Sequence, residues 1–394
     1  MQIIINIQYY TVNSLKIVFN TTNMESNGSQ SISIKDLKAG EEYDFEKVEL
    51  IRGETPPDIK EKCLELCKEY LSDNWRQQTV DTISVRRITG GLMDTISVRR
   101  ITGGLSNQLY YCGITSPSIE STAPQEVAIR LYGSKWYNNL NSEGNERLTD
   151  MRSERLSDVI TSLLLSENKL GIKIYGLFDC GQIQHYYHHR QFKLEEQNNA
   201  KLAEELFRKM ARIHAMEVPL RKGEWILREI DMQYAEAEKR FSVDKLASDL
   251  NLETLKAHDL KTEIEWLKNT VLKLKSPLAF SHNDLLSSNI LVLNEKSDSG
   301  DQLVICDFEY SSYGYRGLDL GTVVNEWGRL WNDFQSVHQF ADDSTIRRLL
   351  QYYISENELI FGKSWSDNEI NSMDQLIKEA KVNWEKKNTK IIGE

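Results

Sequence analysis

Apolar side chains first recur at helical spacing after a long polar stretch at the N-terminus. Residues 1–55 are rich in Ser and Asn, a composition typical of a poorly ordered extension. Pro56 and Pro57 then precede a run whose apolar side chains stand three or four positions apart, which predicts a helix over about residues 57–75. The apolar positions of this helix are Ile59, Cys63, Leu66, Cys67 and Tyr70.

Short runs of β-branched and aromatic residues dominate the next part of the chain. They predict strands at 126–131, 172–178 and 183–187, with a helix near 154–168 between the first two. A strand–loop–strand at 96–112 precedes them. This order predicts a small antiparallel sheet that carries one helix.

Beyond residue 187 the pattern turns helical. One apolar stripe occupies Leu202, Leu206, Met210 and Ile213, and helical sequence continues through 246–274. A last helix is predicted from Ser366, because Glu369 completes a capping box with it. Two short strands, at 290–293 and 303–306, flank an acidic turn.

These elements predict an α+β protein with two lobes. A β-rich N-lobe is expected over residues 56–187, and a larger, mainly helical C-lobe over residues 188–394. A cleft between two lobes is a common place for a ligand.

A short unit is repeated inside the predicted N-lobe. DTISVRRITGGL begins at Asp81 and again thirteen residues later at Asp94, a period far below the roughly 20–50 residues of solenoid repeats. Only the second copy runs directly into Ser106. We therefore expect the second copy to form the strand, and the first copy (81–93) to be an inserted loop or loosely paired edge with its arginines in solvent.

Composition narrows the class of protein. The 394-residue chain is 40% hydrophobic, and its net charge of −11 argues against a nucleic-acid binder, which usually carries a basic face. Five scattered cysteines without a CxxC pair favour reduced thiols in the cytoplasm. The longest apolar run near the N-terminus is Ile3–Ile5, so neither a signal peptide nor a membrane span is expected.

The most informative segment is SHNDLLSSNILVL, at residues 281–293. Asp284 and Asn289 form the pattern H-x-D-x4-N, and Asp307 follows the second short strand. Phosphoryl transfer needs a carboxylate to receive the hydroxyl proton and hard oxygen ligands for magnesium. Asp and Asn are also common in turns, so the D-x4-N pair alone is weak evidence. Followed by a strand and DFE, it favours a phosphotransferase site.

These two blocks resemble the signatures of the choline/ethanolamine kinase family. HNDxxxxNIL is followed by ICDFEYSSYGYRGLDLG, which is specific to this family, and IRLYG, SENKLGIKIYGLF and GGLSNQLYYC extend the similarity from about residue 81 to about 384. The resemblance implies a bilobal protein-kinase-like fold with a nucleotide-binding N-lobe. It also implies phosphorylation of choline and/or ethanolamine by ATP with Mg²⁺, the first step of phosphatidylcholine and phosphatidylethanolamine synthesis. A cytoplasmic enzyme is implied, and a homodimer is allowed.

The resemblance assigns roles to single residues. It implies Asp284 as catalytic base and Asn289 and Asp307 as magnesium ligands, with His282 and Asp319 as structural support of the loop. Four positions are implied at the nucleotide, namely Ser106, Asn107, Arg130 and Asp158. Three are implied at the amino alcohol, whose quaternary ammonium aromatic faces attract: Tyr310, Glu326 and Trp331.

Departures from the family pattern leave alternatives open. Leu286 replaces a polar residue beside the expected magnesium site, and Asp158 is shorter than the usual Glu. The chain ends at Glu394 without the Trp-rich helix that completes the aromatic box in relatives, so a weak amino-alcohol site is expected. One alternative is a pseudokinase or binding subunit of the same fold. Another is a kinase for a different aminated alcohol or sugar.

Overall fold

A computed structural model describes residues 55–88, 107–116, 121–132, 147–223, 225–249, 251, 256, 259–325 and 341–381. The predicted N-terminal extension therefore lies outside the described residues. The chain divides into two compact units. We call the described part of 51–220 with 284–311 the sheet unit, and the described part of 221–283 with 312–394 the helical unit. The boundary predicted at residue 187 stays a prediction.

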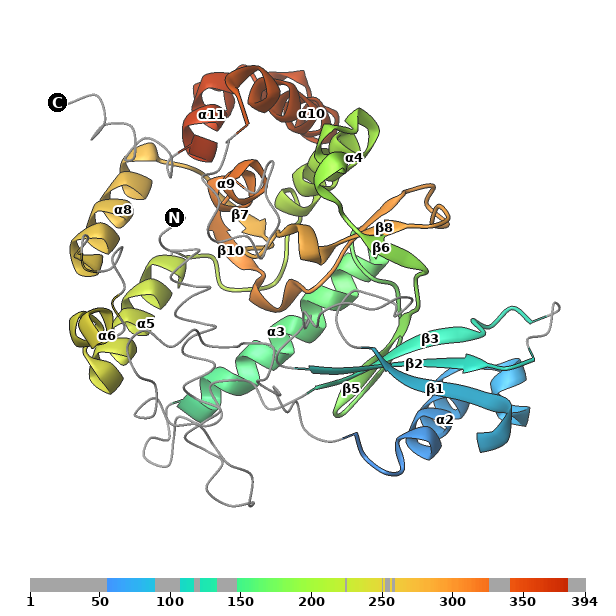
Figure 1. Cartoon of the computed structure of the whole chain (residues 1–394). Helices are drawn as coiled ribbons and strands as arrows, with labels where there is room; N and C mark the ends of the chain where they lie inside the picture. The colour runs from blue at the N-terminus through green and yellow to red at the C-terminus, as the bar shows by residue number, and fades with distance from the viewer. Residues whose placement is uncertain are drawn as a thin grey trace. The chain divides into compact units, whose positions relative to one another are not determined.

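One antiparallel sheet organises the sheet unit (Figure 1). Its described strands lie in the order β1-β2-β3-β5-β4. Their bounds are β1 Ile83–Ile88, β2 Asn107–Ile114, β3 Glu126–Tyr132, β4 Ile174–Phe178 and β5 Gly181–His185. Helix α3 (Arg147–Glu167) lies between β3 and β4 in the chain, which confirms the predicted antiparallel sheet with one helix between the strands at 126–131 and 172–178.

Alternation along the strands sends one set of side chains toward helix α2 (Ile59–Tyr70). Cys63 and Cys67 of α2 pack in one buried cluster with Tyr110, Val127 and Ile183 of the sheet. The predicted helix was longer, but the backbone turns extended at Leu71 and a 3-10 turn follows at Asp73–Gln77. The opposite side chains of β3 and β5 are left to build the site described below.

The first copy of the repeat, not the second, forms strand β1. Ile83–Ile88 pair with β2 along six residues, so the prediction that residues 81–93 are a loop or a loosely paired edge is wrong. β1 is nevertheless an edge strand. Arg86 stays exposed, but its guanidinium stacks on Tyr111 at 4.4 Å and donates to the Tyr186 hydroxyl at 2.9 Å.

The lengths of the two connections that flank the strand do not distinguish the copies. With the first copy in place, five residues join Gln77 to Ile83 and eighteen join Ile88 to Asn107. With the second copy (96–101) the two lengths would be exchanged, because the copies are thirteen residues apart. Closure entropy depends on the logarithm of each length, so the exchange leaves its sum unchanged.

Local contacts before the strand favour the first copy. The backbone N–H of Thr79 donates to the Thr82 hydroxyl at 2.8 Å, and that hydroxyl donates to the Thr79 carbonyl at 3.1 Å. Val80 packs against the α2 cluster. The two hydrogen bonds use the backbone of residue 79 and the hydroxyl of Thr82, which the second copy retains as Thr95. The difference between the copies at this point is therefore Val80, where the second copy has Met93.

The rest of the sheet unit leads to the segments at 281–293 and 305–321 that resemble the family signatures. Strands β6 (His189–Gln191), β8 (Ile290–Leu293) and β9 (Leu303–Ile305) form an antiparallel sheet in the order β6-β8-β9. Helix α4 (Ala200–His214) holds the β8–β9 hairpin, because Glu205 accepts the backbone N–H groups of Gln302 and Leu303.

The helical unit is built mainly from helices around a short pair of strands. Its helices are α5 Trp225–Phe241, α6 Val243–Asp249, α8 Leu260–Leu274, α9 Gly317–Asn325, α10 Asp343–Phe361 and α11 Met373–Lys381. Strand β7 (Leu278–Ser281) pairs antiparallel with β10 (Ser312–Tyr315).

The last helix does not begin at Ser366 as predicted. Two 3-10 turns, at Lys363–Trp365 and Glu369–Asn371, occupy that stretch, and Asn368 caps the second. The helix begins at Met373, where the hydroxyl of Ser372 accepts the backbone N–H of Gln375 at 3.3 Å.

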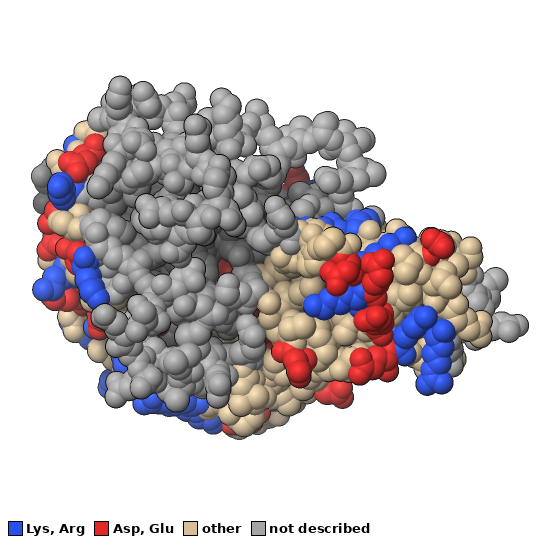
Figure 2. Space-filling model, turned by 90° about the horizontal axis from the view of Figure 1, so that it is seen from below, with Lys and Arg blue, Asp and Glu red and all other residues tan. Residues whose placement is uncertain are grey.

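Acidic and basic side chains are intermixed over the described residues on the face that Figure 2 shows. Among the described helices, none combines the length and the apolar character needed to cross a bilayer.

Deleting Asp81–Met93 tests the account of β1. The product is the same polypeptide that removal of residues 93–105 would give, so a single copy must fill the strand with five residues on either side. Shortening one connection from eighteen to five residues is expected to raise the free energy of unfolding by about 1 kcal/mol. Urea denaturation followed by tryptophan fluorescence measures this. A loss of cooperative unfolding would show that the sheet needs the longer connection.

Candidate active site

The turn after β7 is held by one buried carboxylate. Asp319, only 1% exposed, accepts the backbone N–H of His282 at 2.7 Å and that of Asn283 at 2.8 Å. Asn283 has a φ of 63°, in the left-handed region that Asn tolerates better than most residues. Its amide also donates to the Ser312 hydroxyl at 3.0 Å. These contacts fix the backbone directly before Asp284.

Asn289 orients Asp284 from the other end of the loop. Its side-chain amide donates to the backbone carbonyl of Asp284 at 2.8 Å and to the Asp284 carboxylate at 3.1 Å. Because the amide N–H₂ points at Asp284, the carbonyl Oδ1 of Asn289 remains as a hard oxygen donor. The five-residue spacing noted in the sequence therefore closes a compact loop, which ends at the start of β8.

Asp307 lies two residues after the end of β9, and its φ of 64° is again left-handed. Arg130 of β3 lies 3.6 Å from the Asp307 carboxylate and 3.9 Å from that of Glu309. Asn107 at the start of β2 donates to Glu309 at 3.5 Å. Arg130 and Asn107 of the sheet thus contact the DFE segment, residues 307–309.

Burial and acidic neighbours act in opposite directions on Arg130. Its side chain is 11% exposed. Burial lowers the pKa of the guanidinium, but Asp158, Asp307 and Glu309 outweigh it, so the pKa is raised and the group stays charged. Burial also raises the pKa of the Cys306 thiol; Asp307 and Asp284 add to that shift, and Arg130 opposes it. The charges of Asp307, Asp284 and Arg130 therefore all act on the pKa of the Cys306 thiol.

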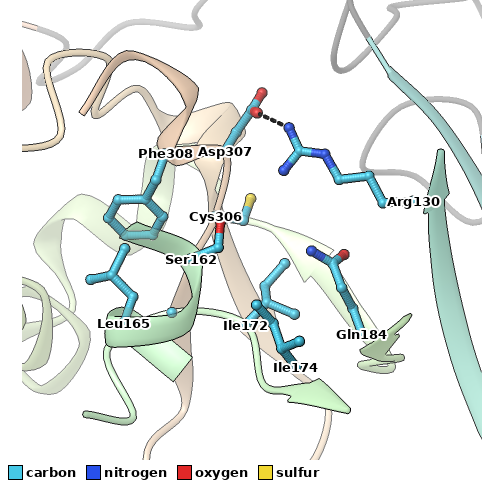
Figure 3. Close-up of a pocket in the computed structure, with 10 residues that line it drawn as sticks. Arg130, Ser162, Leu165, Ile172, Ile174, Gln184, Cys306, Asp307 and Phe308 are labelled. Carbon is cyan, nitrogen blue, oxygen red and sulfur yellow. Dashed lines mark ion pairs between the residues drawn. The ribbon is translucent and has the colours of Figure 1, made fainter. Parts of the chain in front are cut away.

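A small pocket lies beside this cluster, within the sheet unit (Figure 3). Arg130 and Asp307 stand at one end of it, and Ile172 and Ile174 stand at the other. The remaining lining comes from α3, the α3–β4 connection, β5 and the chain around Asp307: Ser162, Leu165, Gly171, Gln184, Cys306 and Phe308.

Asp158 of α3 influences Arg130 without an ion pair among the described residues. It is buried, and its Oδ1 has no hydrogen-bond partner in the described part of the chain. Gln182 of β5 is also fully buried with both amide atoms unpartnered there.

Comparison with known proteins identifies the family. The family model for choline/ethanolamine kinase matches residues 98–389, a match that begins inside the second copy of the repeat. Choline/ethanolamine kinase of Rattus norvegicus is 32% identical over 273 residues, which cover 68% of this chain. The chain belongs to the choline/ethanolamine kinase family.

The aligned part covers 61% of the rat protein, so the chain spans less than two thirds of that relative's length. Two solved structures are similar to the model. A choline kinase from Cryptosporidium parvum gives a TM-score of 0.53 at 19% identity, covering 82% of this chain and 87% of that one. An ethanolamine kinase from Plasmodium vivax gives 0.51 at 18%, covering 84% and 80%. These likenesses confirm the predicted α+β kinase-like fold.

The structure brings together most of the residues that the family resemblance singled out. Asp284, Asn289, Asp307, Arg130 and Asn107 all belong to the sheet unit. Tyr310 follows in a 3-10 turn at Phe308–Tyr310, half-buried. Three of the predicted positions lie outside the described residues: Ser106, Glu326 and Trp331.

Some contributors were not predicted as site residues. Asn283 and Cys306 stand next to predicted positions, and the signal for Asn283 was present, since Asn is the commonest non-glycine residue at positive φ. Nothing in the sequence pointed to Cys306. Leu286, which departs from the family pattern, is buried in the core at 3% exposure, so its side chain packs instead of facing a ligand.

The donor set fits the magnesium ion that this family implies. Mg²⁺ is usually held by one or two carboxylates together with substrate phosphates, and rarely by an all-protein cage. Asp307 supplies a carboxylate and Asn289 an amide oxygen. In the described part of the chain no group of three or more His, Cys, Asp or Glu side chains could hold a metal.

Replacing Arg130 by Met tests how far the acidic cluster depends on this buried cation. The variant removes the positive charge that faces Asp158, Asp307 and Glu309, so the free energy of unfolding should fall by about 3 kcal/mol in urea titrations. Arg347→Met is the matched control, because Arg347 pairs with Asp374 at the surface, where both side chains are at least half exposed. That change should stay within about 0.5 kcal/mol. Equal losses in both variants would mean that solvent already screens the Arg130 cluster.

Proposed function

We propose that this chain is a magnesium-dependent kinase that transfers the γ-phosphoryl group of ATP to the hydroxyl of choline, ethanolamine or both. The observation that carries the proposal is the convergence of Asp284, Asn289, Asp307 and Arg130 in one compact unit. These four residues would supply a base, two oxygen ligands for a metal and a cation for phosphates, which are the groups that phosphoryl transfer requires.

Asp284 is the proposed general base. Its carboxylate accepts a hydrogen bond from Asn289 at 3.1 Å, which holds it in one orientation. The backbone on its N-terminal side is fixed by Asp319, so the carboxylate can receive the proton of a hydroxyl as the oxygen attacks phosphorus. Positioning of this kind is the main contribution of the protein in phosphoryl transfer.

Asp307 and Asn289 would hold the metal. When bound, Mg²⁺ would neutralise charge that develops on the transferred phosphoryl group. Arg130 lies 3.6 Å from Asp307, too far for a hydrogen bond, and its guanidinium could turn from the carboxylate to a phosphate oxygen. Asn107, which donates to Glu309, opens β2 directly after the proposed phosphate loop at Ser106.

The amino-alcohol site is proposed from family positions. Tyr310 is described next to Glu309, while Glu326 and Trp331 complete the set by resemblance. An aromatic face and a carboxylate together recognise an ammonium cation, and the overall charge of −11 suits a cationic substrate. A cytoplasmic location and assembly as a homodimer remain part of this proposal. No described residue favours the pseudokinase alternative.

ADP release from MgATP tests the function directly. The purified chain is assayed with choline, with ethanolamine and with neither, and release should depend on at least one amino alcohol. Asp284→Asn should lower kcat by about 10²–10⁴ and leave nucleotide binding within about threefold, because a general base acts on the chemical step alone. Asp298→Asn, a change at a side chain that is 94% exposed, is the control. Release without dependence on amino alcohol, or a D284N enzyme within tenfold of wild type, would contradict the proposal.

Asp307→Ala separates the metal site from the nucleotide site. If Asp307 binds Mg²⁺, the variant should weaken MgATP binding by about tenfold or more, while binding measured in EDTA changes little. Calorimetric titrations with and without Mg²⁺ give the two constants. Equal losses under both conditions would assign Asp307 a structural role only.

A further inference from the structure

A buried ion pair lies in the helical unit, outside the proposed site. Arg316, directly after β10, binds Glu379 of α11 through two parallel contacts of 2.8 Å and 3.0 Å. The two side chains are 4% and 0% exposed. A fork-to-fork pair of this kind fixes both position and orientation of the two side chains, because each hydrogen bond constrains a different atom.

Every remaining polar atom of the pair has a partner. Arg316 also donates to Asn371 at 2.7 Å and to the carbonyl of Ile370 at 2.5 Å. Glu379 accepts from the Ser276 hydroxyl at 2.8 Å and from Gln375 at 3.2 Å. The network therefore ties α11 to Ser276, two residues before β7, and to Arg316, the residue that precedes α9.

Helix α9 starts against this network. Gly317, its first residue, lies so close to α11 that a Cβ there would stand 3.1 Å from the Cβ and the carbonyl oxygen of Glu379. Two residues further on, Asp319 accepts the N–H groups of His282 and Asn283. Thus four consecutive residues, 316–319, carry the contact with α11 at one end and the contact with the turn before Asp284 at the other.

We propose that Glu379, acting through Arg316, is a positioning residue for Asp284. Glu379 holds Arg316 and the start of α9, the start of α9 places the Asp319 carboxylate, and Asp319 fixes the backbone from which Asp284 extends. Neither Glu379 nor Arg316 touches the proposed reacting groups. The inference rests on the proposed function in one respect, that Asp284 is the base whose placement sets the rate.

The position of the pair argues for more than stabilisation of α11. A well-packed apolar pair would stabilise a buried helix contact at least as well as an ion pair does. An apolar pair has no directional hydrogen bonds. Here the chain at Arg316, directly after β10, must have one orientation so that Asp319, three residues later, can reach two backbone N–H groups.

Glu379→Gln is the principal test, because it keeps the size of the side chain and removes its charge. The matched control is Asp374→Asn on the same helix, which removes the same charge from a pair with Arg347 whose carboxylate is 74% exposed. In hydrogen-exchange mass spectrometry, the peptide that contains His282 and Asn283 should exchange about tenfold faster in E379Q and unchanged in D374N, since Asp319 holds those amides less firmly. Unchanged exchange in folded E379Q overturns the proposal.

Kinetics give the second readout. For the full chain with MgATP and its amino alcohol, E379Q should lower kcat about tenfold or more and leave the KM for MgATP within about twofold, because only the placement of the base has changed. A loss confined to stability or to KM would show a structural role and overturn the proposal. If E379Q does not fold, Arg316→Lys replaces it, because lysine keeps the buried charge and lacks the fork. The same two results are then required.

A double-mutant cycle separates this inference from the proposed function. In the Asp284→Asn background the E379Q change should have almost no further effect on kcat, because the carboxylate that it positions is gone. An equal loss in both backgrounds overturns the positioning role while Asp284 keeps its own. If instead D284N alone has little effect, the proposed base is wrong, and the hydrogen-exchange result still decides whether Glu379 holds the turn.

Discussion

The guanidinium of Arg130 is an almost fully buried positive charge, and the arrangement of the sheet unit around it follows from the need to compensate that charge. Three carboxylates raise its pKa against the effect of burial: Asp158 from α3, and Asp307 and Glu309 from the segment after β9. None of these carboxylates lies on β3, the strand that carries Arg130. Compensating the charge of Arg130 therefore brings α3, the sheet and the DFE segment together. A buried charge of this kind is retained only where it is paired, and that requirement places the acids that a metal and phosphates would use.

The same physical requirement, that buried polar groups find partners, shapes the loop before the proposed base. Two backbone N–H groups in the turn after β7 have no strand partner, and the Asp319 carboxylate accepts both. Asn283 adopts a left-handed backbone there, which lets consecutive N–H groups converge on one acceptor. The result is a rigid approach to Asp284 that depends on residues thirty-five or more positions later in the sequence. Through Arg316, that approach is continuous with α11.

Much of this could be read from local pattern. The helical stripe at Leu202–Ile213 appeared as α4, and the short apolar segments at 126–131 and 290–293 appeared as β3 and β8. The order of apolar and polar side chains along a segment shows whether one face or both faces are buried. The strand from the repeat could not be predicted in this way. Two identical segments have identical propensity, and the closure of the two connections cancels between them. The described contact before the strand that differs is the packing of Val80, where the second copy has Met93.

The sequence by itself determined the family and the α+β class, and it singled out Asp284, Asn289 and Asp307 as the proposed chemical groups, since spacing and residue type carry that information locally. Only the tertiary structure decided which copy forms β1, that the last helix begins at Met373, and that Arg316 and Glu379 form one buried pair with contacts to Ser276, Asn371 and Gln375. Those outcomes depend on which polar groups are buried next to one another when the chain folds. Residues far apart in sequence meet there because each buried charge or N–H must find its partner, and no local pattern records the distant half of such a pair.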